Sequence, residues 1–382
     1  MTPRERVLKT LRFEEPDRVP FFEQGVDSAN ASRILGREAI TGGGNARFRS
    51  MEAGWEGPDA YAEAGVRARD DWADLIEVMD MDAVTGAWTG GGVPSARIDE
   101  LTFRFDDPAT DTWTIQRFSP DSDTLYEVDS SLMSEGMPAL ERVMAYRIEH
   151  YQTPTPNLDA HGDVKWRLDH FHPHRAVAGS SGLSIPNRPA VWLEAIASRP
   201  DLVEAHLDMQ CEQACAVIEA QAQLGVDFIW GGGDLAATRG PLYSPAHFHR
   251  FMLPRLKKMT EVCDRHGLVY FFRTDGWLWP IADDLFVNSG VTGYGEIDMV
   301  AGMDLAEIRE KLPHLVLWGN VDCAGALVTG TPEDVAAETR ACIDKAAAGG
   351  GYILGSSNVI HSQCRTDNFL AMVETCREYG VY

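Results

Sequence analysis

Gly225-Val-Asp-Phe-Ile-Trp-Gly-Gly-Gly-Asp234 opens the part of the sequence in which apolar runs and helical segments alternate most regularly. Four further apolar runs follow it, at residues 268–272, 291–296, 315–318 and 352–354. Residue types that begin helices lie after these runs, at Ser244-Pro245, Asp304-Leu305, Thr331-Pro332 and Thr366-Asp367. Short runs rich in β-branched and aromatic residues, alternating with amphipathic helices, are typical of a parallel sheet buried on both faces. This part of the chain therefore predicts an α/β fold.

Three more candidate strands lie upstream, at residues 18–22, 81–84 and 175–180, which brings the number of strands to eight. No glycine fingerprint of the dinucleotide-binding kind follows the first of them. We therefore expect a closed (β/α)8 barrel, with an amphipathic N-terminal helix at residues 2–13. Barrels with insertions reach this length as one unit, so residues 1–382 are interpreted as a single barrel domain.

An antiparallel β-hairpin or meander is predicted between the second and third barrel strands. From residue 101 to residue 130 the apolar residues alternate with period two, and Asp, Pro and Ser turns divide the pattern. We place the whole insertion at about residues 95–165 of the sequence. The pattern leaves open whether it is a lid or an interface.

The composition excludes several classes of partner. With 58 acidic and 34 basic side chains, the formal net charge is −24, which opposes binding to nucleic acids and anionic membranes. The sequence has no apolar run of about 18 residues and no secretory core at its N-terminus. Seven cysteines at scattered spacings fit a reducing compartment. We therefore expect a cytoplasmic protein.

The chemistry of such a barrel is carried by loops at the carboxyl ends of its strands. The side chains just after the predicted strands are Glu23, Trp88, Ser180, Asp234, Arg273, Asp275, Glu296, Cys323, Asn358 and His361. Aromatic side chains at the strand ends are expected to form a flat apolar pocket: Trp88, Trp230, Phe272, Tyr294 and Trp318. The densest histidine cluster, His170, His172 and His174, could bind a metal or belong to a polar loop.

Several motifs point to a known family. They include Glu15-Pro-Asp-Arg-Val-Pro20, Gly319-Asn-Val-Asp322 and Gly349-Gly-Gly-Tyr-Ile-Leu-Gly-Ser-Ser-Asn358, with further segments at 1–8, 231–245, 301–306 and 330–335. With these motifs the chain resembles the uroporphyrinogen decarboxylase superfamily, which contains decarboxylases and corrinoid-dependent methyltransferases. The resemblance implies a barrel fold for nearly the whole chain.

The decarboxylase branch fits the sequence less well than the methyltransferase branch. Decarboxylases of the family carry a Met-Arg-Gln-Ala-Gly-Arg signature, whereas Phe21-Phe-Glu-Gln-Gly-Val-Asp-Ser28 has no arginine. Methyltransferases of the family that act on thiols bind zinc through His-x-Cys and a later Cys. This chain has Arg273-Thr-Asp275 and Asn358 at the matching positions. A thiol acceptor at this site is therefore not expected.

The resemblance to O-demethylase methyltransferases implies transfer of a methyl group from a small, aromatic methyl ether to a corrinoid protein. Zinc, if bound as in some such enzymes, would be held by Glu296, Cys323 and Cys364, and would polarise the ether oxygen. Without zinc, Arg273 or His361 would stabilise or protonate that oxygen. The barrel mouth must then be open to the partner protein, and a homodimer is possible.

An alternative interpretation is a methylcorrinoid:tetrahydrofolate methyltransferase. Asp275 and Asn358 would hydrogen bond to the pterin edge, because carboxylate and amide groups suit that face. Asp234 and Asn358 are thus the candidate cofactor-binding residues, and Arg273, Asp275 and His361 the candidate catalytic residues. A decarboxylase is the second alternative, and it would require several arginines around the pocket.

Overall fold

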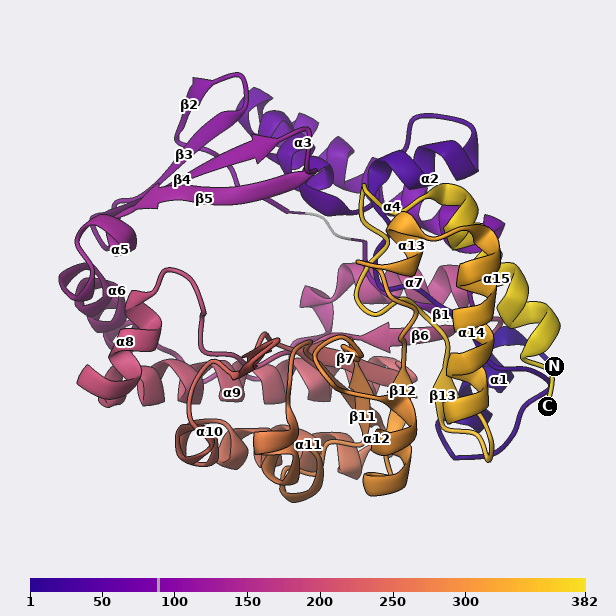
Figure 1. Cartoon of the computed structure of the whole chain (residues 1–382). Helices are drawn as coiled ribbons and strands as arrows, with labels where there is room; N and C mark the ends of the chain where they lie inside the picture. The colour runs from indigo at the N-terminus through magenta and orange to yellow at the C-terminus, as the bar shows by residue number, and fades with distance from the viewer. Residues whose placement is uncertain (88–89) are drawn as a thin grey trace.

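A curled parallel sheet of seven strands forms the centre of the protein. The computed structural model describes residues 1–87 and 90–382 (Figure 1). The strands are, in sheet order, β1 (Ala83–Val84), β6 (Ala176–Gly179), β7 (Phe228–Gly232), β10 (Val269–Arg273), β11 (Gly293–Gly295), β12 (Val316–Trp318) and β13 (Tyr352–Ile353). All neighbouring strands are parallel. The α/β prediction is therefore confirmed, with each of these strands at its predicted place.

The eighth predicted strand, residues 18–22, is an extended segment rather than a strand. Phe21 makes one isolated parallel bridge with Leu354, whose N–H donates to the carbonyl of Pro20 at 2.8 Å. On its other side, the Phe21 carbonyl accepts from the N–H of Asp82 at 2.7 Å, just before β1. Proline has no N–H to give to a ladder, which limits pairing here. The segment nevertheless hydrogen bonds to both edges of the curled sheet.

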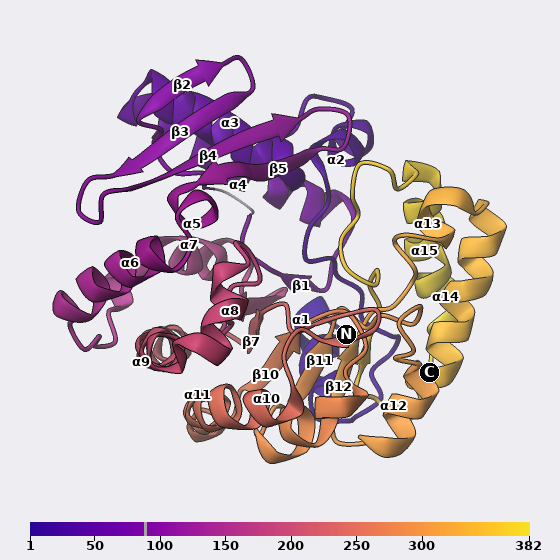
Figure 2. The same cartoon turned by 60° about the vertical axis from the view of Figure 1, so that its left-hand side comes forward.

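The helices outside the insertion surround the parallel sheet, apart from the helix at Gly43–Glu56, which packs on the insertion sheet (Figure 2). They are α1 (Pro3–Thr10), α2 (Ser28–Leu35), α3 (Gly43–Glu56), α4 (Pro58–Val78), α8 (Val191–Ser198), α9 (Pro200–Leu224), α10 (Pro245–Phe251), α11 (Leu253–Arg265), α12 (Leu305–Lys311), α13 (Ala326–Thr329), α14 (Pro332–Ala346) and α15 (Thr366–Tyr379). Short helical turns η2 (Trp279–Ile281) and η3 (Asp283–Asn288) and a small ribbon of β8 (Ala236–Ala237) and β9 (Gly240–Pro241) complete this part.

Three of the four predicted helix starts carry side-chain caps, whereas α15 follows Arg365, which makes no side-chain cap. Ser244 accepts from the N–H of His247, and Asp304 accepts from two N–H groups at the start of α12. Thr331 forms a full capping box with Asp334. Each cap satisfies amide groups that a helix leaves unpaired, and is typically worth about 1 kcal/mol. These local signals fix where the helices between the strands begin.

The insertion between β1 and β6 contains the predicted antiparallel sheet, and helices that were not predicted follow it. Its strands are β2 (Ala96–Asp99), β3 (Thr102–Asp107), β4 (Thr112–Ser119) and β5 (Thr124–Ser130). α5 (Ser131–Ser134), α6 (Met137–Glu149), η1 (Leu158–Ala160) and α7 (Gly162–Phe171) lead back to β6. Phe103 and Phe118 of this sheet pack on Phe48 and Met51 of α3, which gives the insertion a small core of its own. The sheet lies above the parallel sheet in Figure 2.

The two ends of the chain meet at the closing edge of the parallel sheet. The N–H of Val19 donates to the carbonyl of Gly380, and Arg18 forms a bridge with Val381. Arg6 and Arg18 both pair with Asp82, a fully buried carboxylate before β1. Unpaired, this carboxylate would be costly to bury, so the two arginines are needed for the packing. Within the described residues, no helix is both long enough and apolar enough to span a membrane.

Candidate functional site

Gln24 is the centre of a hydrogen-bonded cluster at the carboxyl ends of the strands. Its side-chain amide donates to Glu296 Oε1 at 2.7 Å and to the carbonyl of Asn358 at 2.6 Å. Its Oε1 accepts from Arg273 and from the indole N–H of Trp230. One side chain therefore joins groups from the ends of β7, β10, β11 and β13 with the segment before β1. The convergence of strand-end groups is the arrangement predicted for a barrel enzyme.

Arg273 is the last residue of β10, and its guanidinium group lies across the cluster. Its Nε donates to the carbonyl of Gly231 at 2.9 Å, and Nη1 lies 3.4 Å from Glu296 Oε1. The guanidinium carbon is 5.6 Å from the ring centroid of Trp230. A cation placed over an indole face in this way is attracted by the ring. The arginine is thus held in one orientation by a backbone carbonyl, a carboxylate and a ring.

Glu296 follows β11 in the left-handed region, with φ of 61°. A non-glycine residue pays about 1 kcal/mol or more for this backbone conformation, which often marks a functional position. Burial raises the pKa of Glu296, and Arg273 and Gln24 lower it only in part. Nearby Asp275 and Asp234 raise it further. Glu296 therefore keeps its proton to a higher pH than an ordinary glutamate.

Asp275 and Asn358, predicted to act together, do lie side by side. Asn358 Nδ2 donates to Asp275 Oδ2 at 3.3 Å. Burial raises the pKa of Asp275, and Asp234 and Asp298 raise it further by repulsion. Asp234 itself is exposed and accepts from Asn187 Nδ2 at 3.1 Å. The edge of the site beside Arg273 is therefore rich in carboxyl groups.

A cavity of about 410 Å³ adjoins the cluster. Gln24, Trp230 and Arg273 form one wall, and Arg47 and Arg167 lie on others. Sequence reasoning missed Gln24, Arg47 and Arg167. Gln24 follows Glu23, a predicted strand-end residue, and could have been found by reading one position further. Arg47 lies on α3 and Arg167 on α7, outside the strand ends, so no strand-end pattern marks them.

The predicted aromatic pocket is correct only for Trp230 among the described residues. Phe272, Tyr294 and Trp318 have no exposed surface and belong to the core. Trp318 packs edge-on against Trp230 with ring centroids 5.1 Å apart, and so supports the cavity wall from behind. Tyr294 packs instead on Phe286 of the helical segment Asp283–Asn288, on the outer face of the sheet. Phe272 follows Phe271, which contacts Trp230, so Phe272 also faces outward, because successive strand side chains alternate between faces. Trp88 lies outside the described residues.

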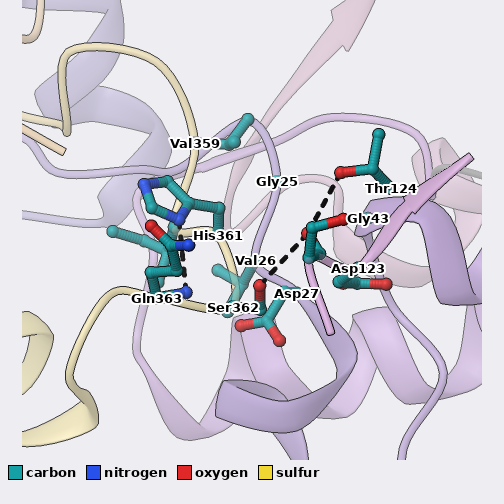
Figure 3. A pocket seen from close by; sticks show the side chains of 12 residues that line it. Gly25, Val26, Asp27, Gly43, Asp123, Thr124, Val359, His361, Ser362 and Gln363 are labelled. Carbon is teal, nitrogen blue, oxygen red and sulfur yellow. Dashed lines mark hydrogen bonds between the residues drawn. The ribbon is translucent and has the colours of Figure 1, made fainter. Parts of the chain in front are cut away.

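Cys323, His361 and Cys364 form a second group, beside a different cavity. His361 Nε2 lies 2.8 Å from the carbonyl of Cys323, and its Nδ1 accepts from the N–H of Gln363 at 3.2 Å. A hydrogen bond with Cys364 raises the pKa of His361, against the effect of burial. His361 lines a cavity of about 370 Å³ between the loops at residues 25–27, 122–124 and 359–363 (Figure 3). Its ring nitrogens are both occupied, and a catalytic role for it stays a prediction.

The predicted zinc ligands do not form a metal site as they stand. Glu296 is bonded to Gln24 and Arg273, whereas Cys323 Sγ accepts from the Ser357 hydroxyl at 3.2 Å, and Cys364 Sγ lies 3.6 Å from the carbonyl of Cys323. Within residues 1–87 and 90–382, no three His, Cys, Asp or Glu side chains are grouped so that they could hold a metal. This arrangement gives no support to the zinc prediction, and we derive no step through zinc.

The histidine cluster is not such a group either. His170 is in the last turn of α7 and stacks on Trp166 with centroids 4.7 Å apart. His172 and His174 follow the helix, and the His174 carbonyl accepts from the N–H of Arg4. This hydrogen bond connects the segment before β6 to α1. It therefore fits the polar-loop interpretation.

A parallel α/β sheet with converging polar groups at its carboxyl edge defines the class of barrel-type enzymes. Residues 186–379 match the family described as Uroporphyrinogen decarboxylase (URO-D), and the chain belongs to this family. The structure is similar to that of a methyltransferase from Methanosarcina mazei, with a TM-score of 0.63, 16% sequence identity and 99% of each chain covered. None of the curated proteins compared matches the sequence.

Proposed function

We propose that this protein is a methyltransferase that moves a methyl group from a small, methoxylated aromatic compound to a corrinoid carried by a separate protein. The observation that carries the proposal is the junction of the Gln24 cluster with the cavity. There an acid, a fixed guanidinium group and an indole ring meet at the carboxyl edge of the sheet. The fold similarity to a methyltransferase and the absence of the family's N-terminal arginine signature support the same reading.

The chemistry requires help for the departing oxygen. The ether carbon–oxygen bond would break with its electron pair on the oxygen, and a Co(I) corrinoid on the partner protein would supply the electron pair for the new bond to the methyl carbon. The oxygen then needs one proton. Arg273 supplies a positive charge beside the cavity, and Glu296, whose pKa is raised, supplies the proton. Glu296 returns to its protonated form from solvent after the phenol has left.

Enzyme assays with a free corrinoid test this proposal. Cobalamin reduced to its Co(I) form by titanium(III) citrate is incubated with the protein and a panel of methoxylated aromatics. We expect methylcobalamin and the matching phenol in equal amounts, measured by absorbance and mass spectrometry. The Arg273→Lys variant should be slower, because lysine keeps the charge but not the bonds to Gly231 and Gln24. Product formation no faster than without protein contradicts the proposal.

Two observations favour other reactions. The adjacency of Asp275 and Asn358 suits the pterin edge of tetrahydrofolate, with methyl transfer from the methylcorrinoid to the folate. The three arginines around the cavity suit a decarboxylase, yet about 410 Å³ is near the lower end of small-molecule pockets and small for a tetrapyrrole with eight carboxylates. Formation of methyltetrahydrofolate from added methylcobalamin and tetrahydrofolate identifies the first case, and release of CO₂ from added uroporphyrinogen identifies the second.

A further inference from the structure

The cavity beside the Gln24 cluster is locally basic, in a chain that is strongly acidic. Its charged lining consists of Arg47, Arg167, Arg273 and Asp163. The whole chain has a formal net charge of −24. Three arginines at one small cavity are therefore unexpected in a chain with so many acidic side chains. They indicate a ligand that is itself negatively charged.

Arg167 is held rigidly with one amino group left over. It is 4% exposed, its Nε donates to Asp163 Oδ2 at 2.9 Å, and its Nη1 donates to the carbonyl of Ala178 at 2.6 Å. No hydrogen bond joins its Nη2 to any residue in the described part of the chain. A Cβ added at Gly86, also in the lining, would lie 3.7 Å from this Nη2. Glycine thus leaves the amino group uncovered on the cavity side.

Arg273, at the end of β10, is likewise held by hydrogen bonds that leave one amino group unused. Its Nε and Nη1 are used by Gly231, Gln24 and Glu296, while Nη2 has no hydrogen-bond partner among residues 1–87 and 90–382. In the described part of the chain, neither amino group is among the buried unpaired side-chain atoms, so both are accessible to an acceptor in the cavity. Two fixed guanidinium groups with one donor each facing a shared cavity make an anion site.

We propose that the substrate is a methoxylated aromatic acid, whose carboxylate is held by Arg167 and Arg273, with Arg47 on α3 contributing charge from above. This inference rests on the proposed methyl transfer. Guanidinium groups match the planar carboxylate in shape and charge. Asp163, in the first turn of α7, also lies in this lining, and its negative charge disfavours a phosphate group more than a singly charged carboxylate. Trp230 provides an apolar face beside the carboxylate site.

Binding measurements separate the carboxylate from the rest of the substrate. Isothermal titration calorimetry compares 4-methoxybenzoate with 4-methoxybenzamide, its neutral counterpart of nearly the same shape. We expect the acid to bind at least about 10-fold more tightly than the amide, with an affinity that falls as salt is added. Arg167→Gln and Arg47→Gln should each remove much of this preference and leave amide binding nearly unchanged.

Arg49 offers a matched control for Arg47. It lies on the same helix two residues later, and its guanidinium group lies near Glu38 and Glu52 at 3.7 and 3.5 Å on the outer surface. Arg49→Gln should keep the preference for the acid. A thermal melt of each variant checks that the fold is retained, which matters most for buried Arg167.

The outcomes distinguish this inference from the proposed function. Equal affinity for the acid and the amide, or no binding of either, overturns the carboxylate site. Tighter binding of inorganic phosphate than of the acid overturns it too. If the acid binds through the arginines but no methyl group is transferred, the carboxylate site stands and the methyl-transfer proposal fails.

Discussion

Glu23 has no exposed surface, and it links the segment before β1 to the loop after β13. Its Oε1 accepts from the N–H of Ser356 at 2.6 Å and its Oε2 from the Ser356 hydroxyl at 2.9 Å. Burial raises the pKa of Glu23 from 4.5 to about 8, although the bonds from Ser356 lower it. Near neutral pH this residue is therefore a protonated acid in the folded protein, and an ionised carboxylate in the unfolded chain.

The sign of the resulting pH effect follows from this difference. Stability due to the raised pKa is fully present below about pH 4.5 and is lost as the pH rises to about 8, because only the unfolded chain releases the proton in that window. One pKa unit corresponds to about 1.4 kcal/mol, so between pH 5 and pH 8 the loss is on the order of 4 kcal/mol. Glu23→Gln cannot ionise and should not show this loss.

Urea unfolding followed by circular dichroism at pH 5 and pH 8 measures the effect. We expect the free energy of unfolding to fall by a few kcal/mol more in the original protein than in Glu23→Gln. Glu310→Gln, at an exposed position of α12, is the matched control and should behave like the original protein. Equal pH dependence in the original protein and Glu23→Gln would refute the reasoning.

Three further results are expected. Gln24→Leu leaves Glu296 and Arg273 without their shared partner, so the methyl-transfer rate should fall about 10-fold or more while the melting temperature drops by only a few degrees. In Glu296→Gln, the decline in rate at rising pH should disappear, because that decline reflects loss of the Glu296 proton; an unchanged pH–rate profile would exclude Glu296 as the acid. Phe103→Ala empties the core between the insertion and α3, and should cost about 3 kcal/mol or more in urea unfolding. Weaker binding of 4-methoxybenzoate should accompany it, since Arg47 is on α3.

The sequence predicted the parallel strands because each is a short apolar run, and a helix start follows four of these runs. Three strands of the insertion were predicted from their period-two pattern, but β2, Ala96–Asp99, was missed because it is short and mostly exposed. The segment at residues 18–22 reads as a strand by composition. The hydrogen bonds of this segment to the sheet could not be predicted. Their number depends on Pro20 and on the length of the neighbouring strands β1 and β13, which have two residues each.

The site residues at the ends of strands were predicted from the sequence. The site residues on helices were missed. Arg273, Glu296 and Asn358 follow strands, and parallel strands bring their ends together. Arg47 and Arg167 reach the cavity from helices before and after the insertion, so their positions depend on how that layer packs. Burial of Tyr294 and Trp318 depends on which face of the strand points inward, which composition alone does not reveal.

The hydrogen bonds from Ser356 to Glu23 and from Gln24 to Asn358 join residues more than 330 positions apart. During translation, Glu23 and Gln24 leave the ribosome long before Ser356 and Asn358 are synthesised. During synthesis the segment at residues 20–24 must therefore wait, with Glu23 in water and ionised, until the loop after β13 emerges. A nascent chain that stalls before residue 356 can hold most of the sheet and still have no binding site. The Gln24 cluster can therefore form only after residues 356–358 have left the ribosome.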